Sequence, residues 1–180
     1  MSGRKRRSRW LWPAVALILV GAVVGGTLVA RANRGPAQPI SAGSSAPLEL
    51  AGTDPVTGRR VSLASYSGKP VVLNIWASWC PGCRAEARDL AAFERAHPEV
   101  QVVGLDTQDN DGDARAFYRQ FGWRHPSIRD PSGATAARLG LQGLPTTIFI
   151  DSRHRIVTKI IGATNRAGFE QGLRAALHRA

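Results

Sequence analysis

Hydrophobic and polar positions divide the 180-residue chain into three parts. Residues 11–30 form an apolar run of twenty residues without a charge. Residues 31–47 are rich in Pro, Ser, Gly and Ala and show no hydrophobic period. From residue 48 to 180, short apolar runs alternate with stretches of helical period, which predicts a single α/β domain.

The pattern within residues 48–180 predicts a mixed sheet with helices on both faces. A nearly continuous apolar run over residues 70–78 is typical of a central strand that is buried on both sides. Asp111 or Asp113 is expected to cap the second helix. Strands are predicted over residues 70–78, 100–105, 146–150 and 155–161, and helices over 81–97, 114–121, 134–139 and 168–179. Because active sites of such sheets lie at the carboxyl ends of the strands, residues 77–83 are expected to carry the chemistry.

The apolar run 11–30 is long enough to cross a bilayer. At 1.5 Å per residue a helix of this length spans about 30 Å, the thickness of the hydrocarbon core. Five cations precede the run and only Arg31 and Arg34 follow closely, so the positive-inside rule predicts a single-pass anchor in the cell membrane. Residues 1–10 would then lie in the cytoplasm and the domain outside it, joined by a flexible linker over residues 31–47. The alternative is a signal peptide cleaved near Ala32, which would release the domain as a secreted protein.

The net charge of +11 is concentrated near the N-terminus. Residues 1–34 hold seven cations and no acid, whereas residues 35–180 hold 17 Lys and Arg against 13 Asp and Glu, a balance of 17 − 13 = +4. No basic stripe with interleaved aromatic residues and no motif for reading bases is found there. The sequence therefore predicts no nucleic-acid partner.

Cys80 and Cys83 are the two cysteines of the chain, separated by Pro81 and Gly82. At the start of the predicted helix they can form a disulfide within one turn. Such a ring encloses almost no chain and removes little entropy from the unfolded state, so a reversible redox couple explains it better than stabilisation does. Cys80 is expected to be the attacking sulfur, because unpaired N–H groups at a helix start favour its thiolate. Cys83 is expected to be the less exposed, resolving thiol.

Other roles for two cysteines give different predictions. Structural zinc needs about four ligands, and the four histidines show no paired metal-ligand spacing, so neither a zinc site nor a cofactor is predicted. Monovalent copper could bind two thiolates alone, and a purely structural disulfide would suit an oxidising compartment. The acidic run 106–113 lacks the carboxylates of a calcium loop and is interpreted as a loop and helix cap.

Glu86 lies one helical turn after Cys83, within the apolar stripe of the predicted helix. None of its helical neighbours three or four positions away is a cation. A buried carboxyl there would have a raised pKa and could exchange a proton with Cys83. The alternative is a solvated glutamate at the edge of the stripe. Pro145, by its position alone, is a proline that begins a strand.

The stretch VVLNIWASWCPGCRAE, followed later in the chain by GLPTTIFID, resembles the TlpA/ResA-like branch of the thioredoxin family. The resemblance covers nearly all of residues 48–180 and implies a thioredoxin-like fold. It implies that Cys80 and Cys83 are the nucleophilic and resolving cysteines and that Glu86 handles protons beneath the active site. Asn74 stands where cytoplasmic thioredoxins carry a buried aspartate.

The same resemblance implies a binding site for an extended substrate chain next to the sulfur pair. Pro145 matches the family proline that follows a cis peptide bond and faces the disulfide. Leu144 would offer backbone groups to the substrate, and Trp79 precedes the first cysteine at the same site. These three residues are the expected substrate contacts.

The residues and the resemblance together predict an extracytoplasmic, membrane-anchored thiol–disulfide oxidoreductase that reduces protein disulfides. Membrane-tethered relatives often reduce apocytochrome c so that haem can be attached, and such reduction implies a transmembrane electron donor. The Pro81-Gly82 pair differs from the dipeptides of the best-known members, so the direction of electron flow stays open. A disulfide-forming oxidase is one alternative, and a non-enzymatic copper-binding or carrier module is another.

Overall fold

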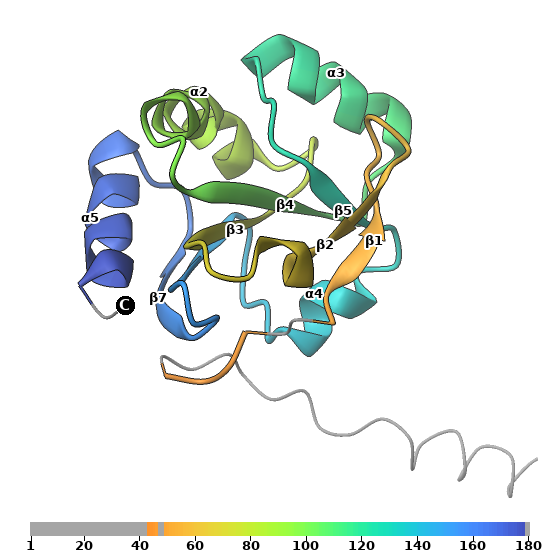
Figure 1. Cartoon of the computed structure of the whole chain (residues 1–180). Coiled ribbons are helices and arrows are strands. Elements are labelled where there is room, and N and C mark those ends of the chain that lie inside the picture. The colour runs from red at the N-terminus through yellow and green to blue at the C-terminus, as the bar shows by residue number, and fades with distance from the viewer. Residues whose placement is uncertain (1–42, 47–48, 179–180) are drawn as a thin grey trace, which may run out of the picture. The chain divides into compact units, whose positions relative to one another are not determined.

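The computed structural model describes residues 43–46 and 49–178. Within them, a five-stranded sheet lies between two layers, with α2 and α3 above it and α4 below it in the view of Figure 1. The elements in chain order are β1 Ala51–Thr53, β2 Arg60–Ser62, the 3-10 helix η1 Leu63–Tyr66, β3 Val71–Trp76, α2 Pro81–Ala96, β4 Gln101–Thr107, α3 Asp111–Phe121, β5 Ser127–Asp130, α4 Ala134–Arg138, β6 Thr146–Ile150, β7 Ile156–Ile161 and α5 Arg166–Leu177.

The sheet is mixed, as the sequence predicts. Its strand order is β5-β4-β3-β6-β7. β3 runs parallel to β4, and β4 to β5, whereas β6 is antiparallel to both β3 and β7. All six residues of the central strand β3 are buried, which explains its continuous apolar pattern. The carboxyl ends of β3 and β4 therefore meet at one edge of the sheet.

A hydrophobic core lies on each face of the sheet. One core packs α2, α3 and α5 against residues such as Val72, Trp76 and Phe149. The other packs η1, the β1–β2 hairpin and α4 against residues such as Leu73 and Ile75. Alternate residues of β3 thus point to opposite cores, as the pleat of a strand requires. This arrangement fixes the start of α2 against the end of β3.

Three strands and one helix cap differ from the sequence prediction. β1, β2 and β5 are three or four residues long and carry polar residues, so they lack the apolar run that marked the other strands. The prediction that Asp111 or Asp113 caps the second helix is wrong. Asn110 is the cap, and its side chain accepts a hydrogen bond from the Asp113 amide at 3.0 Å. The two aspartates lie inside the first turn, where their negative charge interacts favourably with the helix dipole.

The N-terminal predictions fall mainly on residues that the structure does not describe. The apolar run 11–30 and most of the linker 31–47 lie there, so the membrane anchor and the signal peptide stay predictions. No helix in the described part of the chain is long and apolar enough to cross a membrane. Four residues of the predicted linker, 43–46, are described and pair with the β6–β7 hairpin through the Gly43 amide and the Ile156 carbonyl at 2.7 Å.

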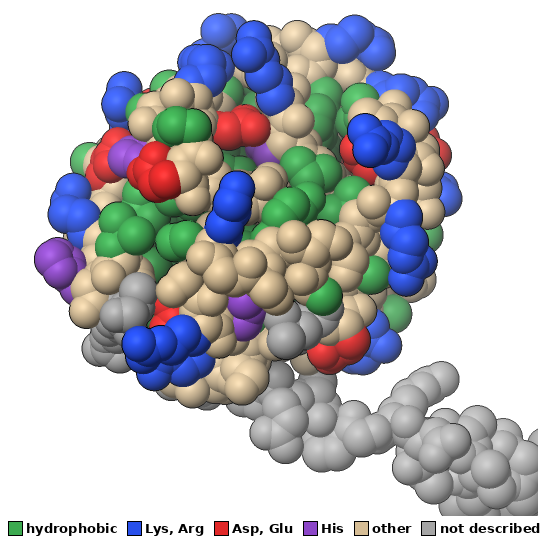
Figure 2. All heavy atoms as spheres, viewed as in Figure 1, with side chains coloured by type: hydrophobic (Ala, Val, Ile, Leu, Met, Phe, Trp, Pro, Cys, Tyr) green, Lys and Arg blue, Asp and Glu red, His purple; other side chains and the backbone are tan. Residues whose placement is uncertain are grey.

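Charged side chains are dispersed over the visible face of the domain. Figure 2 shows Lys and Arg side chains around the rim of that face, separated by hydrophobic and uncharged groups. They are not gathered into one stripe in this view.

Candidate active site

The two predicted sulfurs meet at the junction of β3 and α2. Cys80 is the N-cap of α2 and forms a disulfide with Cys83, with the two Cα atoms 5.2 Å apart. The Cys83 amide donates to the Cys80 Sγ at 3.1 Å. Pro81 occupies the first helical position, where its missing N–H has no helical partner to lose. One amide of the first helical turn, that of Cys83, thus points at the first sulfur.

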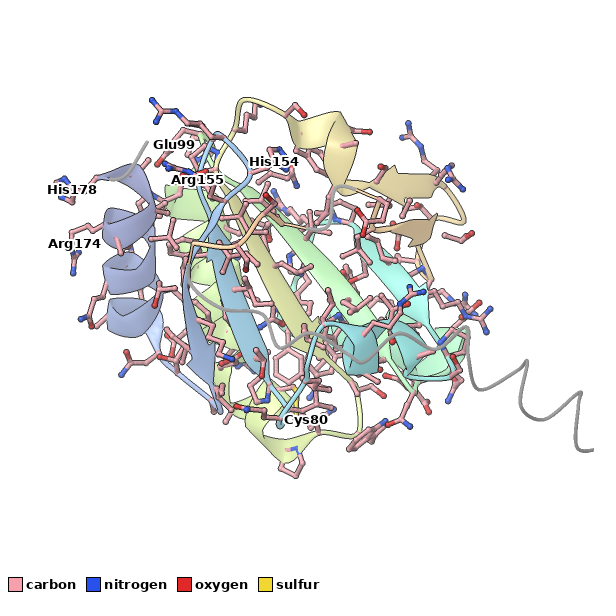
Figure 3. All side chains as sticks on the ribbon, turned by 90° about the horizontal axis from the view of Figure 1, so that it is seen from below. Cys80, Glu99, His154, Arg155, Arg174 and His178 are labelled. Carbon is pink, nitrogen blue, oxygen red and sulfur yellow. A yellow bond between two sulfur atoms is a disulfide. The ribbon has the colours of Figure 1, made fainter. Side chains whose placement is uncertain are left out.

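Both sulfurs are enclosed in this oxidised state. Cys80 is 3% exposed and Cys83 is 1% exposed. Figure 3 shows Cys80 at one end of the sheet. The order in which the two sulfurs attack therefore stays a prediction.

The turn before Cys80 is fixed from two sides through Ser78. The Asp109 carboxylate, from the loop after β4, accepts from the Ser78 amide and from the Ser78 hydroxyl, the latter at 2.9 Å. Arg84 of α2 donates to the Ser78 carbonyl at 3.2 Å. The Arg84 guanidinium also lies over the Phe121 ring, with its carbon 5.3 Å from the ring centroid. Both the amide and the carbonyl of Ser78 therefore have a side-chain hydrogen-bond partner.

The loop before β6 lies directly against the disulfide ring. Its Leu144–Pro145 peptide bond is cis, as the resemblance implies. A Cβ added to Gly82 would lie 2.9 Å from the Pro145 Cδ and 3.6 Å from the Leu144 carbonyl oxygen. Glycine between the cysteines therefore permits a contact that a larger residue would prevent. Pro145 is buried and Leu144 is half-buried.

Two apolar side chains are exposed around this junction. Trp79 is 56% exposed, and its indole N–H donates to the Gln108 carbonyl at 3.0 Å. Ile161 is 47% exposed and lies beside the Pro145 loop, because a Cβ on Gly143 would be 3.9 Å from it. Exposed aromatic and aliphatic groups next to a reactive site are typical of a surface that contacts another chain.

Glu86 is buried, so the alternative of a solvated glutamate is wrong. The residue is 1% exposed. Its two carboxylate oxygens accept from the Asn74 side chain and from the Thr164 amide, each at 2.9 Å. Burial raises the pKa of Glu86 to about 7, because the two hydrogen bonds offset only part of the desolvation and Asp89 adds a small upward effect. The group can therefore gain or lose a proton near neutral pH.

Asn74 connects Glu86 to the central strands. Its side-chain nitrogen donates to Glu86 and also to the Thr147 hydroxyl at 3.0 Å, while its oxygen is buried without a hydrogen-bond partner. A side-chain amide carries donors on one side and an acceptor on the other. If the amide turned over, its oxygen could accept from a protonated Glu86. One residue can therefore serve both ionisation states of the carboxyl.

A second buried carboxyl was not predicted. Asp106, at the end of β4, is 1% exposed, and its Oδ1 has no hydrogen-bond partner. Burial raises the pKa of Asp106 to about 8, with further upward effects from Asp109 and Asp111 and a downward effect from Arg129. The sequence predicts a loop and helix cap over residues 106–113, whereas Asp106 and Thr107 belong to β4. The position of Asp106 directly after an apolar run, at the carboxyl edge of the sheet, is the signal that could have revealed it.

In the described part of the chain, Cys80 and Cys83 are the candidate ligands for a metal ion. Within residues 43–46 and 49–178, no three His, Cys, Asp or Glu side chains lie together as metal ligands would. A copper ion would therefore depend on the Cys80 and Cys83 thiolates alone, after reduction of their disulfide. That donor set fits monovalent copper.

The known proteins that this chain resembles are thiol–disulfide oxidoreductases and related redox proteins. The Redoxin family matches residues 41–177. The thiol-disulfide oxidoreductase ResA of Bacillus cereus is 26% identical over 171 residues, which cover 94% of this chain and 97% of that protein. The thiol:disulfide interchange protein DsbE of Pseudomonas aeruginosa is 31% identical over 118 residues, covering 64% of this chain and 63% of that one.

Solved structures with the same architecture are similar over most of their length. A secreted disulfide oxidoreductase of Mycobacterium tuberculosis, homologous to DsbE, is 27% identical with a TM-score of 0.66, covering 71% of this chain and 96% of that one. A DsbF homologue from Corynebacterium diphtheriae is 31% identical with a TM-score of 0.67, covering 79% and 94%. Sequence and structure therefore point to the same group of proteins.

Proposed function

Because the chain belongs to the Redoxin family and is a thiol–disulfide oxidoreductase of the ResA and DsbE type with a thioredoxin-like fold, we propose that Cys80 and Cys83 reduce protein disulfides outside the cytoplasm. One observation carries the proposal. The disulfide at the start of α2 lies one turn from a buried carboxyl whose pKa is about 7. Such a pair of groups can move electrons and a proton in one place.

The first step forms a mixed disulfide. In the reduced protein, the Cys80 thiolate attacks one sulfur of the substrate disulfide, a new S–S bond joins Cys80 to the substrate, and the second substrate sulfur leaves as a thiolate that takes a proton. The helix start favours the Cys80 thiolate, since the Cys83 amide already points at its sulfur at 3.1 Å. Cys80 is accordingly assigned as the attacking group.

The second step releases the substrate. Cys83 loses its proton, and its thiolate attacks the Cys80 sulfur, so that the Cys80–Cys83 disulfide forms and the remaining substrate sulfur leaves as a thiolate. Glu86 is the proposed acceptor of the Cys83 proton, one helical turn away. The Asn74 amide, by turning over, would accept a hydrogen bond from the protonated carboxyl. Two electrons thus pass from the enzyme to the substrate.

The proposed substrate contacts are Trp79, Leu144 and Pro145. An extended substrate segment would lie along the exposed Trp79 and pair with backbone groups of Leu144 next to the disulfide. The half-buried Leu144 and the exposed Trp79 support this assignment. Pro145 keeps the loop against the sulfur pair, since a Cβ added to Gly82 would lie only 2.9 Å from the Pro145 Cδ.

The proposed location is the outer side of the cell membrane, with the apolar run 11–30 as the anchor. The charge pattern around that run supports this orientation, and the similar protein of Mycobacterium tuberculosis is described as secreted. Reduction there requires electrons from a transmembrane donor. Apocytochrome c is the proposed substrate, on the family resemblance alone.

The reduction potential of the Cys80/Cys83 couple tests the direction of electron flow. We expect a value near or below about −200 mV, in the range of thiol reductants, measured by equilibration with glutathione or dithiothreitol buffers. A potential close to about −120 mV, typical of strong disulfide-forming oxidases, would contradict a reductase. Anaerobic titration with monovalent copper is the companion measurement. Tight one-to-one binding without insulin reduction would support a copper carrier instead.

Protease treatment of spheroplasts tests the location. In a bacterial host that expresses the full chain, we expect the domain to be digested from outside and to stay with carbonate-washed membranes. Recovery in the medium or the soluble extract would support signal cleavage. Protection from external protease would contradict export, and a variant lacking residues 1–30 is the matched control for protection.

A further inference from the structure

Asp106 is enclosed at the carboxyl end of β4, beside the turn that carries Cys80. In the sheet it lies opposite Trp76 of β3 and Arg129 of β5. Its Oδ1 is buried without a partner. An ionised carboxylate is costly to bury without hydrogen bonds, whereas a protonated one is much less so. The surroundings therefore favour a proton on Asp106.

Asp109 links this buried carboxyl to the active-site turn. The charge of Asp109 and hydrogen bonding to its carboxyl group both raise the pKa of Asp106, and Asp109 itself accepts from the Ser78 amide and hydroxyl. Two carboxyl groups can form such a bond only when one of them carries a proton. With the proton on Asp106, the Asp109 oxygens remain acceptors for the Ser78 amide and hydroxyl.

The other charged and titratable groups around Asp106 come from two elements. Asp111 and Tyr118 lie on α3, and Arg129 lies on β5. Arg129 forms an ion pair with Asp111, with its Nε 2.6 Å from the Asp111 Oδ1. The phenol of Tyr118 is buried and has a raised pKa, chiefly because of burial, so it stays neutral. Arg129, the cation that lowers the pKa of Asp106, is therefore already paired with another carboxylate.

We propose that Asp106 is a positioning residue for disulfide exchange, whose proton ties it to Asp109 and thereby holds Ser78 and the turn before Cys80. Loss of that proton would place two negative charges side by side. Asp109, which is half-buried, would then move toward water and release the Ser78 amide and hydroxyl. The inference rests on the proposed role of Cys80 as the attacking sulfur, but the structural link from Asp106 to Ser78 can be tested separately.

The structural link is tested by NMR on the oxidised full chain in detergent micelles. The Cα and Cβ carbon resonances of Ser78, which do not exchange with water, are followed from pH 5.5 to 9.5. We expect one titration step near pH 8 in the native protein, no step in Asp106→Asn, and an unchanged step in Glu86→Gln. A step that persists in Asp106→Asn, or its absence from the native protein, would overturn the proposal.

Two further variants protect the test against misfolding and nonspecific charge effects. Asp109→Asn provides an amide that can donate to an ionised Asp106 while its oxygen faces Ser78, so the step should move down by at least about one pH unit. Asp113→Asn removes the same charge from the exposed first turn of α3 and should leave the step in place. An unshifted step in Asp109→Asn would contradict the link.

The functional consequence is tested on the reduced protein. Its sulfurs are alkylated with iodoacetamide, the modified cysteine is identified by mass spectrometry, and the rate is divided by the thiolate fraction. We expect Cys80 of the native protein to lose about threefold in this normalised rate above pH 8, and Asp106→Asn to show no loss. A parallel loss in Asp106→Asn would count against the positioning role. Faster labelling of Cys83 would instead contradict the proposed function, while the Ser78 titration would still report on Asp106.

Discussion

Buried carboxyl groups lie at both ends of the sheet, but they differ in their partners. At one end, Asp151 follows β6, is 0% exposed, and accepts from the Arg155 amide at 2.8 Å, the Arg155 Nε at 2.9 Å and the Arg153 amide at 3.0 Å. At the other, Asp106 has an unpartnered oxygen and Glu86 accepts from two uncharged donors. Figure 3 shows Arg155 far from Cys80, at the opposite end of the domain.

The difference shows that burial alone does not decide ionisation. Burial tends to raise the pKa of Asp151, yet the hydrogen bonds and charge of Arg155 outweigh it, and the pKa is lowered. For Glu86 the corresponding donors are too weak, and burial raises its pKa to about 7. A carboxyl near the sulfurs therefore keeps a proton that it can exchange, whereas the one at the far end only holds its turn together.

The largest expected effect tests whether disulfide reduction depends on the end of the sheet that carries Cys80 and Cys83. Cys80→Ser should lower the rate of insulin reduction by about a thousandfold or more, because a serine hydroxyl cannot form the mixed disulfide. Turbidity of precipitating insulin measures the rate. Cys83→Ser is the matched control, which should accumulate a mixed disulfide with the substrate. Appreciable turnover by Cys80→Ser would mean that another group attacks.

The far end should contribute stability and no catalysis. Asp151→Ala should lower the free energy of unfolding by about 4 kcal/mol, since the amides of Arg153 and Arg155 lose their acceptor and a charged pair is removed. Urea unfolding measures the loss, and insulin reduction per folded molecule should stay unchanged. Asp151→Asn keeps one acceptor and should lose less. A fall in activity that exceeds the unfolded fraction would break the contrast between the two ends.

The pH dependence of stability sharpens the contrast at Glu86. The pKa of Glu86 is about 7 in the folded protein against 4.5 for an ordinary glutamate, so between these pH values the folded state holds a proton that the unfolded state has released. The free energy of unfolding should therefore fall by about 3 kcal/mol as the pH rises through that window. Glu86→Gln should lack this component.

Urea unfolding at several pH values compares the two proteins. The change with pH is the diagnostic quantity, because Glu86→Gln also removes an acceptor from the Thr164 amide and should be less stable at every pH. Titration of Asp106 also lowers the free energy of unfolding as the pH rises. Because it does so in both proteins, it cancels in the difference between them. Parallel curves for native and variant protein would show that Glu86 is ionised in the folded state throughout.

The smallest effect concerns the surface around the sulfurs. Trp79→Ala should change stability by less than about 1 kcal/mol, because its side chain is 56% exposed. It should raise the KM for a protein substrate about threefold with kcat unchanged. Leu177→Ala, also at an exposed apolar residue on α5, is the control and should alter neither. An unchanged KM in Trp79→Ala would place the substrate elsewhere.

Sequence reasoning located features that depend on local order. The apolar run of β3, the helix that follows it and the position of Cys80 at the helix start can all be read from neighbouring residues. The helical period placed Glu86 on the apolar stripe of α2 with Cys83 and Leu90, but left a solvated position open. The family resemblance was needed to favour a role beneath the active site. These predictions needed no knowledge of distant contacts.

The features that sequence reasoning missed depend mainly on contacts between residues that are distant in sequence. β5 is four residues long, three of them polar, and only its pairing with β4 makes it a strand. The raised pKa of Asp106 depends on its burial first, and then on the neighbouring carboxyl groups of Asp109 and Asp111. Asn110 prevails over the nearby aspartates as the cap because of backbone geometry, which composition alone does not distinguish.

The pairing of residues 43–46 with the β6–β7 hairpin has a practical consequence. The Ala46 amide donates to the His154 carbonyl at 2.7 Å, and Figure 3 places His154 at the end of the domain away from Cys80. A resin or a sensor chip coupled to the chain upstream of these residues would hold the domain at the end that lies away from Cys80. Proteins in solution would then have free access to the end that carries Cys80 and Cys83. The immobilised chain is therefore suited to trapping its partners on a column.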